Sequence, residues 1–143
     1  MSVTFLVGVD GSDGARRAAE FAAERARSEG ARLLLVCVVE WSPFDTLTPD
    51  EQAERHVQRQ KEIEAAETKV LAPLRESLGE GLEDDTLVRH GHVAEVLCEL
   101  ASERGAAQVF SGRRGRGRFK SLLFGSVAGS LVQVSPVPVT VVP

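Results

Sequence analysis

The sequence lacks the features of a membrane-spanning, secreted or disulfide-bonded protein. No apolar stretch is long enough to cross a bilayer, and no basic segment or cleavage site precedes the first apolar run at Val3. The two cysteines, Cys37 and Cys98, each lie in an apolar segment and form no Cys-x-x-Cys pair. We therefore expect a soluble cytoplasmic protein with no membrane partner and with two buried, reduced thiols.

Several enzyme motifs are absent as well. The chain has no Gly-x-x-x-x-Gly-Lys-Ser/Thr, which excludes a P-loop NTPase, and its first predicted strand does not end in Gly-x-Gly-x-x-Gly. His90 and His92 have no third metal ligand at a recognisable spacing, so we expect them in a loop. No serine is recognisably paired with a histidine and a carboxylate. We therefore predict no catalytic residue.

The formal net charge of −4 argues against a nucleic-acid partner, with one local exception. Five of the 17 basic residues lie within the eight positions from Arg113 to Lys120, interleaved with glycines. Arginine binds phosphate through a planar fork, so one or two of these side chains can clamp a phosphate. A solvated loop and a nucleic-acid contact are the alternatives, and only Phe119 offers an aromatic surface for the latter.

The chain does contain a regular alternation of predicted strands and helices. Its 143 residues suffice for one domain with a real core, and we expect a single domain over residues 1–143. Two nearly unbroken apolar runs, Val3 to Val9 and Leu33 to Val39, are typical of strands buried on both faces. Three further strands are predicted at Glu83 to Arg89, Ala106 to Ser111 and Val137 to Val142.

Four predicted helices connect these strands. The first begins after Ser12, a good N-cap, and ends at Gly30. The second begins at Thr48-Pro49-Asp50-Glu51, which combines a capping threonine, an N1 proline and a glutamate three residues after the cap. It continues toward Gly79, although Pro73 should kink or interrupt it. The third helix, whose buried face begins at Val93, is predicted to stop at Gly105, and the fourth is predicted at Ser126 to Val134.

This alternation specifies an α/β fold: an open parallel sheet of five strands with helices on both faces. Ligands of such sheets bind beyond the carboxyl ends of the strands, where the strand order reverses. Glycine-rich segments follow the first and the fourth strands, at Gly8 to Ser12 and at Gly112 to Ser126. Glycines let backbone amides approach an anion, and a helix N-terminus favours negative charge. If those strands are neighbours, both segments line one crevice, with a nucleotide's phosphates over Gly112 to Val127.

The spacing Gly112-x-x-Gly115-x9-Gly125-Ser126 resembles the nucleotide-binding pattern of the universal stress protein family. Three other segments are similar to that family, so the likeness covers essentially the whole chain: Val7 to Ser12, Gly91 to Leu97 and Val137-Pro138-Val139. The resemblance implies a Rossmann-like sheet in the order 3-2-1-4-5 and a homodimer. In the family's ATP-binding branch it also implies an adenine nucleotide in the crevice.

Transferred position by position, the resemblance implies a nucleotide site. Asp10 would lie beside the ribose or a phosphate-bound metal, Val38 would meet adenine through its backbone, and Ser111 would lie beside the ribose. A carboxylate repels a triphosphate unless it accepts sugar hydroxyls or shares a divalent cation, so we expect magnesium to be needed for tight binding. A turn or helix-capping role is the alternative for Asp10. The residues expected to bind the nucleotide are Gly8, Val9, Asp10, Val38, Ser111, Gly112, Arg114, Gly115, Gly125, Ser126 and Val127.

Two functions follow from this site. In the first, ATP or another adenine nucleotide orders the Gly112 to Phe124 loop and biases contacts between subunits or with an unidentified protein partner, with little turnover. In the second, the protein is a slow magnesium-dependent ATPase or phosphotransferase acting near Asp10. The absence of a general base, a water-positioning residue and a P-loop lysine favours the first. A scaffold whose crevice stays empty is a third alternative.

The last predicted strand, Val137 to Val142, bears on the oligomeric state. It is apolar, short and expected at a sheet edge, where a second copy can pair with it. Pro138 removes one backbone donor, so this pairing has to use the other side of the strand or the residues after it. We expect a homodimer formed through this strand.

Overall fold

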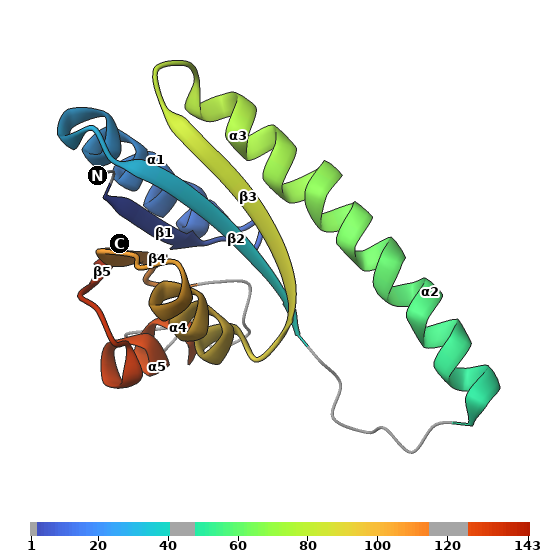
Figure 1. The fold of residues 1–143 in the computed structure, drawn as a ribbon. Coiled ribbons are helices and arrows are strands. Elements are labelled where there is room, and N and C mark those ends of the chain that lie inside the picture. The colour runs from blue at the N-terminus through green and yellow to red at the C-terminus, as the bar shows by residue number, and fades with distance from the viewer. Residues whose placement is uncertain (1–2, 41–47, 115–125) are drawn as a thin grey trace.

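The computed structural model describes residues 3–40, 48–114 and 126–143. These residues form a five-stranded parallel sheet in the order β3-β2-β1-β4-β5, which confirms the predicted fold class and strand order (Figure 1). The strands are β1 (Thr4–Gly8), β2 (Arg32–Glu40), β3 (Glu83–Gly91), β4 (Gln108–Gly112) and β5 (Val139–Val142). The helical segments are α1 (Asp13–Glu29), α2 (Pro49–Ala65), η1 (Ala66–Leu71), α3 (Ala72–Leu78), α4 (Val93–Glu103) and α5 (Ser126–Val134).

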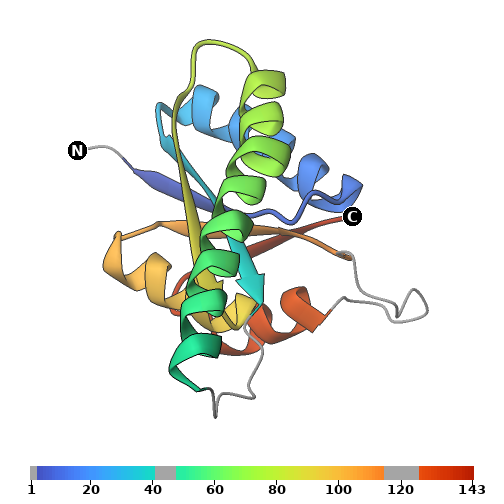
Figure 2. The same ribbon diagram turned by 90° about the vertical axis from the view of Figure 1, so that its right-hand side faces the viewer.

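The helices cover both faces of the sheet and bury a separate core on each (Figures 1 and 2). α1, η1 and α3 pack on one face, and α4 and α5 pack on the other. Strand β2 explains the continuous apolar run, because Leu33 and Leu35 enter the first core while Leu34 and Val36 enter the second. On the α1 face, the rings of Phe5 and Phe110 meet edge to face, with centroids 5.3 Å apart.

The helix ends follow the predicted capping chemistry. The Ser12 hydroxyl accepts a hydrogen bond from the Ala15 amide at 3.1 Å, and α1 ends at Gly30, whose φ of 67° is left-handed. Thr48 and Glu51 form a reciprocal capping box at the start of α2. These local interactions therefore place both helix starts where the sequence predicts them.

The second predicted helix contains a π-helical segment. It is built from α2, η1 and α3, with the π-helix η1 lying just before Pro73. Because proline has no N–H to donate to the carbonyl four residues earlier, the regular hydrogen-bond pattern is interrupted there. The predicted interruption is thus a change of helix type rather than a break. None of the α2 residues is buried, and Figure 1 shows α2 extending past the ends of the strands.

The strand boundaries differ from the prediction by one or two residues, and the shifts in β5 and β3 concern residues discussed above. β5 begins at Val139, so Pro138 lies just before the strand. The Pro138 carbonyl still accepts a hydrogen bond from the Val109 amide of β4, at 2.9 Å. β3 continues through His90 to Gly91, so the expectation of a loop at His90 was wrong. The His90 ring, only 13% exposed, lies 3.0 Å from the carboxylate of Glu62 on α2, and this pair joins α2 to the sheet. His92 occupies the N-cap position of α4.

Both cysteines are free thiols, as expected, but only Cys37 is buried. Cys98 on α4 is half-buried, and burial, with a smaller effect of the neighbouring Glu99 carboxylate, raises the pKa of its thiol. Over the three described ranges, no helix is long and apolar enough to span a membrane.

Candidate nucleotide-binding site

The two glycine-rich segments start at neighbouring strand ends. β1 pairs with β2 on one side and with β4 on the other, through Phe5 beside Gln108 and Val7 beside Phe110. The chain therefore reverses its direction of winding between β1 and β4, and their carboxyl ends lie next to each other. This confirms the condition on which the predicted crevice depends.

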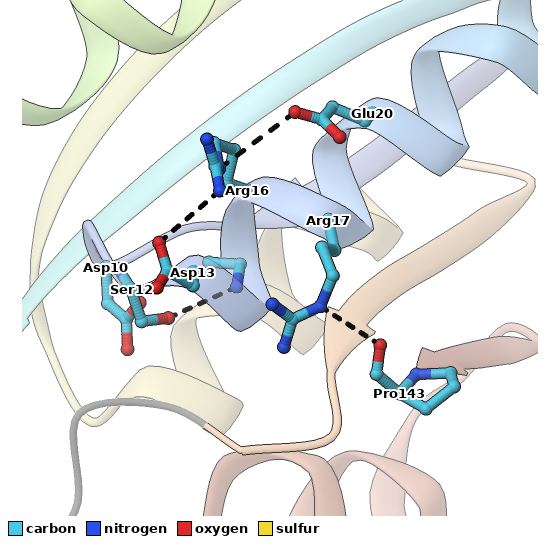
Figure 3. A network of polar contacts seen from close by, with 8 residues as sticks. Asp10, Ser12, Asp13, Arg16, Arg17, Glu20 and Pro143 are labelled. Carbon is cyan, nitrogen blue, oxygen red and sulfur yellow. Dashed lines mark hydrogen bonds and ion pairs between the residues drawn. The ribbon is translucent and has the colours of Figure 1, made fainter.

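The turn after β1 is held by its own polar groups. The Asp10 carboxylate accepts a hydrogen bond from the Ser12 amide at 2.9 Å, and Ser12 in turn caps α1 (Figure 3). The Val9 amide donates to the Val36 carbonyl at 2.8 Å, so the turn is also fixed to β2. Asp10 therefore stabilises the turn, which is the alternative to ligand binding that the sequence leaves open for it. The residue is half-buried at the carboxyl end of β1. The carboxylate is held in place before any ligand arrives.

Two predicted site residues also serve packing on the α4 face. A Cβ built on Gly8 would lie 2.7 Å from the Leu97 Cδ1 atom of α4, so glycine there lets the helix approach the strand. Val38 is half-buried and packs against the core under α4 and α5. The packing of Leu97 against β1 therefore favours glycine at position 8, whether or not the crevice holds a ligand.

At the end of β4 the structure places Ser111 and Gly112 beside the first turn of α1. Ser111 is a buried polar residue, 5% exposed, and its hydroxyl donates to the Gly112 carbonyl at 3.0 Å. The Arg113 amide donates to the Val142 carbonyl at 2.9 Å, which ties the chain leaving β4 to β5. The side chains of Arg113 and Arg114 are exposed. Gly115, Gly125 and the basic residues Arg116, Arg118 and Lys120 lie outside the described residues.

The far side of the predicted crevice is the start of α5. This helix begins at Ser126, and Val127 in its first turn is half-buried against the core under α4 and α5. The first amides of an α-helix have no acceptor within the helix and carry the positive end of its dipole. The backbone at Ser126 and Val127 therefore offers donors to an anion, as the sequence predicts.

The described residues do not form a metal site by themselves. Within them, no group of three or more histidine, cysteine, aspartate or glutamate side chains is placed to bind a metal ion. Asp10 supplies one carboxylate at the crevice. Magnesium is commonly bound by one or two carboxylates together with substrate phosphates, so these residues fit a cation that arrives with a nucleotide.

A pocket that the sequence does not predict lies between α1 and the helical segment formed by η1 and α3. Its volume is about 240 Å³, and Val9 is the one predicted site residue among those that line it. The pocket depends on how η1 and α3 face α1, which no local sequence pattern reveals. Its lining residues are Val9, Gly11, Ser12, Asp13, Ala15, Arg16, Lys69, Val70, Pro73, Leu74 and Ser77.

Comparison with known proteins assigns the family. The model of the universal stress protein family matches residues 1–143. The chain belongs to this family. A universal stress protein of Thermus aquaticus, encoded 3′ of a QAH/OAS sulfhydrylase, is 33% identical over 144 residues, which cover 99% of each chain. The family resemblance stated from the sequence is thereby confirmed.

Solved structures of universal stress proteins share the fold. UspA of Lactobacillus plantarum superposes with a TM-score of 0.82 at 23% identity, covering 99% of this chain and 97% of its own. A universal stress protein of Archaeoglobus fulgidus, solved in complex with dAMP, has a TM-score of 0.65 at 23% identity and covers 99% and 98% of the two chains. At these identities the likeness establishes the Rossmann-like architecture of this chain.

Proposed function

We propose that this universal stress protein binds ATP or another adenine nucleotide in the crevice between β1 and β4 and acts as a regulatory module with little turnover. The observation that supports this most is the adjacency of the two glycine-rich strand ends. The β1 turn brings Asp10, and the β4 end brings Ser111 and Gly112, to one edge of the sheet. The dAMP complex of the Archaeoglobus relative supports an adenine nucleotide as the ligand class.

The parts of the crevice suit different parts of a nucleotide. Asp10 is a fixed carboxylate, which accepts hydrogen bonds from sugar hydroxyls or shares a phosphate-bound magnesium ion. The start of α5 supplies backbone donors for phosphate oxygens. Magnesium, when bound, would neutralise part of the phosphate charge and so remove the repulsion between Asp10 and the phosphates. We therefore propose that tight ATP binding requires magnesium.

Little turnover is expected because the described part of the crevice has no general base beside the expected phosphates. Asp10 already accepts the Ser12 amide, and the three histidines lie at other elements: His56 is on α2, His90 contacts Glu62, and His92 precedes α4. A slow magnesium-dependent ATPase or phosphotransferase is the competing function. Multiple turnovers under saturating magnesium and ATP that disappear in Asp10→Asn would favour the enzyme over the regulatory module.

The binding proposal is tested by calorimetry with ATP, AMP, GTP and adenosine, with and without magnesium. We expect ATP to bind more tightly with magnesium, and Gly115→Ala to weaken ATP binding about tenfold, the value of one charge-assisted hydrogen bond. Gly129→Ala is the matched control, because a Cβ at Gly129 in α5 meets nothing within 4 Å. The absence of any nucleotide binding by the wild-type protein would refute the proposal.

We also propose that β5 forms a homodimer interface. β5 lies at the end of the strand order and pairs with β4 along one edge. The carbonyls of Pro138 and Val142 point to β4, because they accept the amides of Val109 and Arg113. By the alternation of a strand, the backbone groups of Val139 and Val141 point to the opposite, open edge. Pro138 therefore lacks a donor on the β4 side only, and the open edge is available to a second copy.

A further inference from the structure

The first turn of α1 and the end of β4 approach each other backbone to backbone. A Cβ built on Gly14 would lie 2.5 Å from the carbonyl oxygen of Arg114, and one built on Gly112 would lie 2.7 Å from the carbonyl carbon of Gly14. Ordinary contacts of a Cβ atom begin at 3.4 Å. Neither glycine has a positive φ, so backbone conformation does not require glycine at these positions. Glycine is required there because the two backbones approach each other too closely for a side chain.

Gly14 is otherwise an unfavourable residue for its place. It is the second residue of α1, and glycine weakens a helix relative to alanine. The remaining buried positions of α1 are all alanines: Ala15, Ala18, Ala19, Ala22, Ala23 and Ala26. An alanine at position 14 would continue this pattern and favour the helix. The chain forgoes that gain at a buried position of α1 that lies directly against the Arg114 backbone.

This contact joins the two sides of the proposed nucleotide crevice. Gly14 follows the Asp10 to Ser12 turn by two residues, and Arg114 follows Gly112 by two residues on the other side. The Arg113 amide joins the same region to β5 by donating to the Val142 carbonyl, and Arg17 joins α1 to Pro143, just after β5, by donating from its Nε to the Pro143 carbonyl at 3.2 Å (Figure 3). A displacement of residues 112–114 therefore disturbs both the crevice and its bonds to β5.

We propose that Gly14 is a positioning residue that sets the distance between the β1 turn and the end of β4. Its missing side chain fixes where the chain leaves β4, and so where the backbone donors for phosphate begin. An alanine would force Arg114 and α1 apart by roughly 0.9 Å to reach an ordinary contact. The consequence for ligand binding rests on the proposed function, whereas the consequence for the backbone does not.

The test uses the full chain as Gly14→Ala, with Gly129→Ala as the matched control in an unobstructed helical position. Hydrogen exchange of the Arg113 amide reports the backbone directly, because this amide is bonded to Val142. We expect its exchange to become at least about tenfold faster in Gly14→Ala, which corresponds to a free energy of local opening that is lower by about 1.4 kcal/mol. The control should leave the exchange unchanged.

Calorimetry with ATP and with adenosine supplies the second readout. Gly14→Ala should weaken ATP binding about tenfold, one charge-assisted hydrogen bond, and change adenosine binding by less than about twofold. A general structural role would weaken both ligands alike, and that result would overturn the inference. So would unchanged Arg113 exchange, or a variant that fails to fold. If the wild-type protein bound neither ligand, the nucleotide proposal would fail, while Arg113 exchange would still decide the role of Gly14.

Discussion

The contact between Gly8 and Leu97 allows a quantitative test of whether a site glycine exists for packing or for a ligand. Leu97 is fully buried, and a Cβ on Gly8 would lie 2.7 Å from its Cδ1 atom, 3.4 Å from Cδ2 and 3.7 Å from Cγ. Overpacking of this kind in Gly8→Ala should lower the free energy of unfolding by about 1–3 kcal/mol. Leu97→Ala should lower it by about 2–5 kcal/mol through the cavity it leaves.

The double variant should be more stable than the sum of these two losses predicts. Truncating Leu97 removes all three atoms that the new methyl group would meet, and that methyl group then fills part of the cavity. The overpacking loss disappears, so we expect a favourable coupling energy of about 1–3 kcal/mol, within the range observed for residues in contact. Urea unfolding of the four proteins at equilibrium measures this value, provided that the denaturant slopes agree.

Additivity would refute this reasoning. If the two losses add within about 0.5 kcal/mol, Gly8 and Leu97 are not in steric conflict, and the glycine has another cause. A ligand-related cause has its own signature in the same variants. In that case ATP binding weakens in Gly8→Ala and is not restored when Leu97→Ala is added, whereas a packing cause predicts that restored packing also restores binding.

Three further predictions follow from individual contacts. Ser12→Ala should lower the free energy of unfolding by about 1 kcal/mol through loss of the α1 cap, which a thermal melt would detect, and an unchanged melt would exclude the cap. The raised pKa of Cys98 means that less reactive thiolate forms at a given pH, so its alkylation should require higher pH in the folded protein than in urea; equal pH profiles would contradict this. Val141→Pro should shift sedimentation at micromolar concentration toward monomer by removing an outward donor of β5, and a wild-type protein that sediments only as monomer would refute the interface.

The sequence predicts the fold well because much of it depends on local chemistry. The capping residues Ser12 and Thr48 bond to amides three residues away, so their partners can be read from the chain itself. The continuous apolar run of β2 reflects burial on two faces and identifies a central strand without further information. The adjacency of β1 and β4 follows from the strand order, which the family resemblance implied.

The features that escaped prediction are contacts between distant segments. The backbones of Gly14 and Arg114 approach closely and bring α1 against the chain after β4. The residues around Gly14 do not predict this contact. The loop predicted at His90 is wrong because the weak, charged sequence of β3 does not reveal that this strand continues to Gly91. The pocket beside α1 likewise requires the packing of η1 and α3, which only the folded arrangement defines.

The π-helical segment η1 sets the rotation of α2, which precedes it, relative to α3, which follows it. A π-helix bonds each amide to the carbonyl five residues earlier and so holds more residues per turn than an α-helix. If the six residues of η1 became regular α-helix, at about 100° per residue, they would turn the chain further and rotate α2 relative to α3. Leu74 and Leu78 would stay anchored, but Glu62 would swing away from His90. The helix type of η1 thus decides which side of the projecting α2 is presented to the sheet and which to the surroundings.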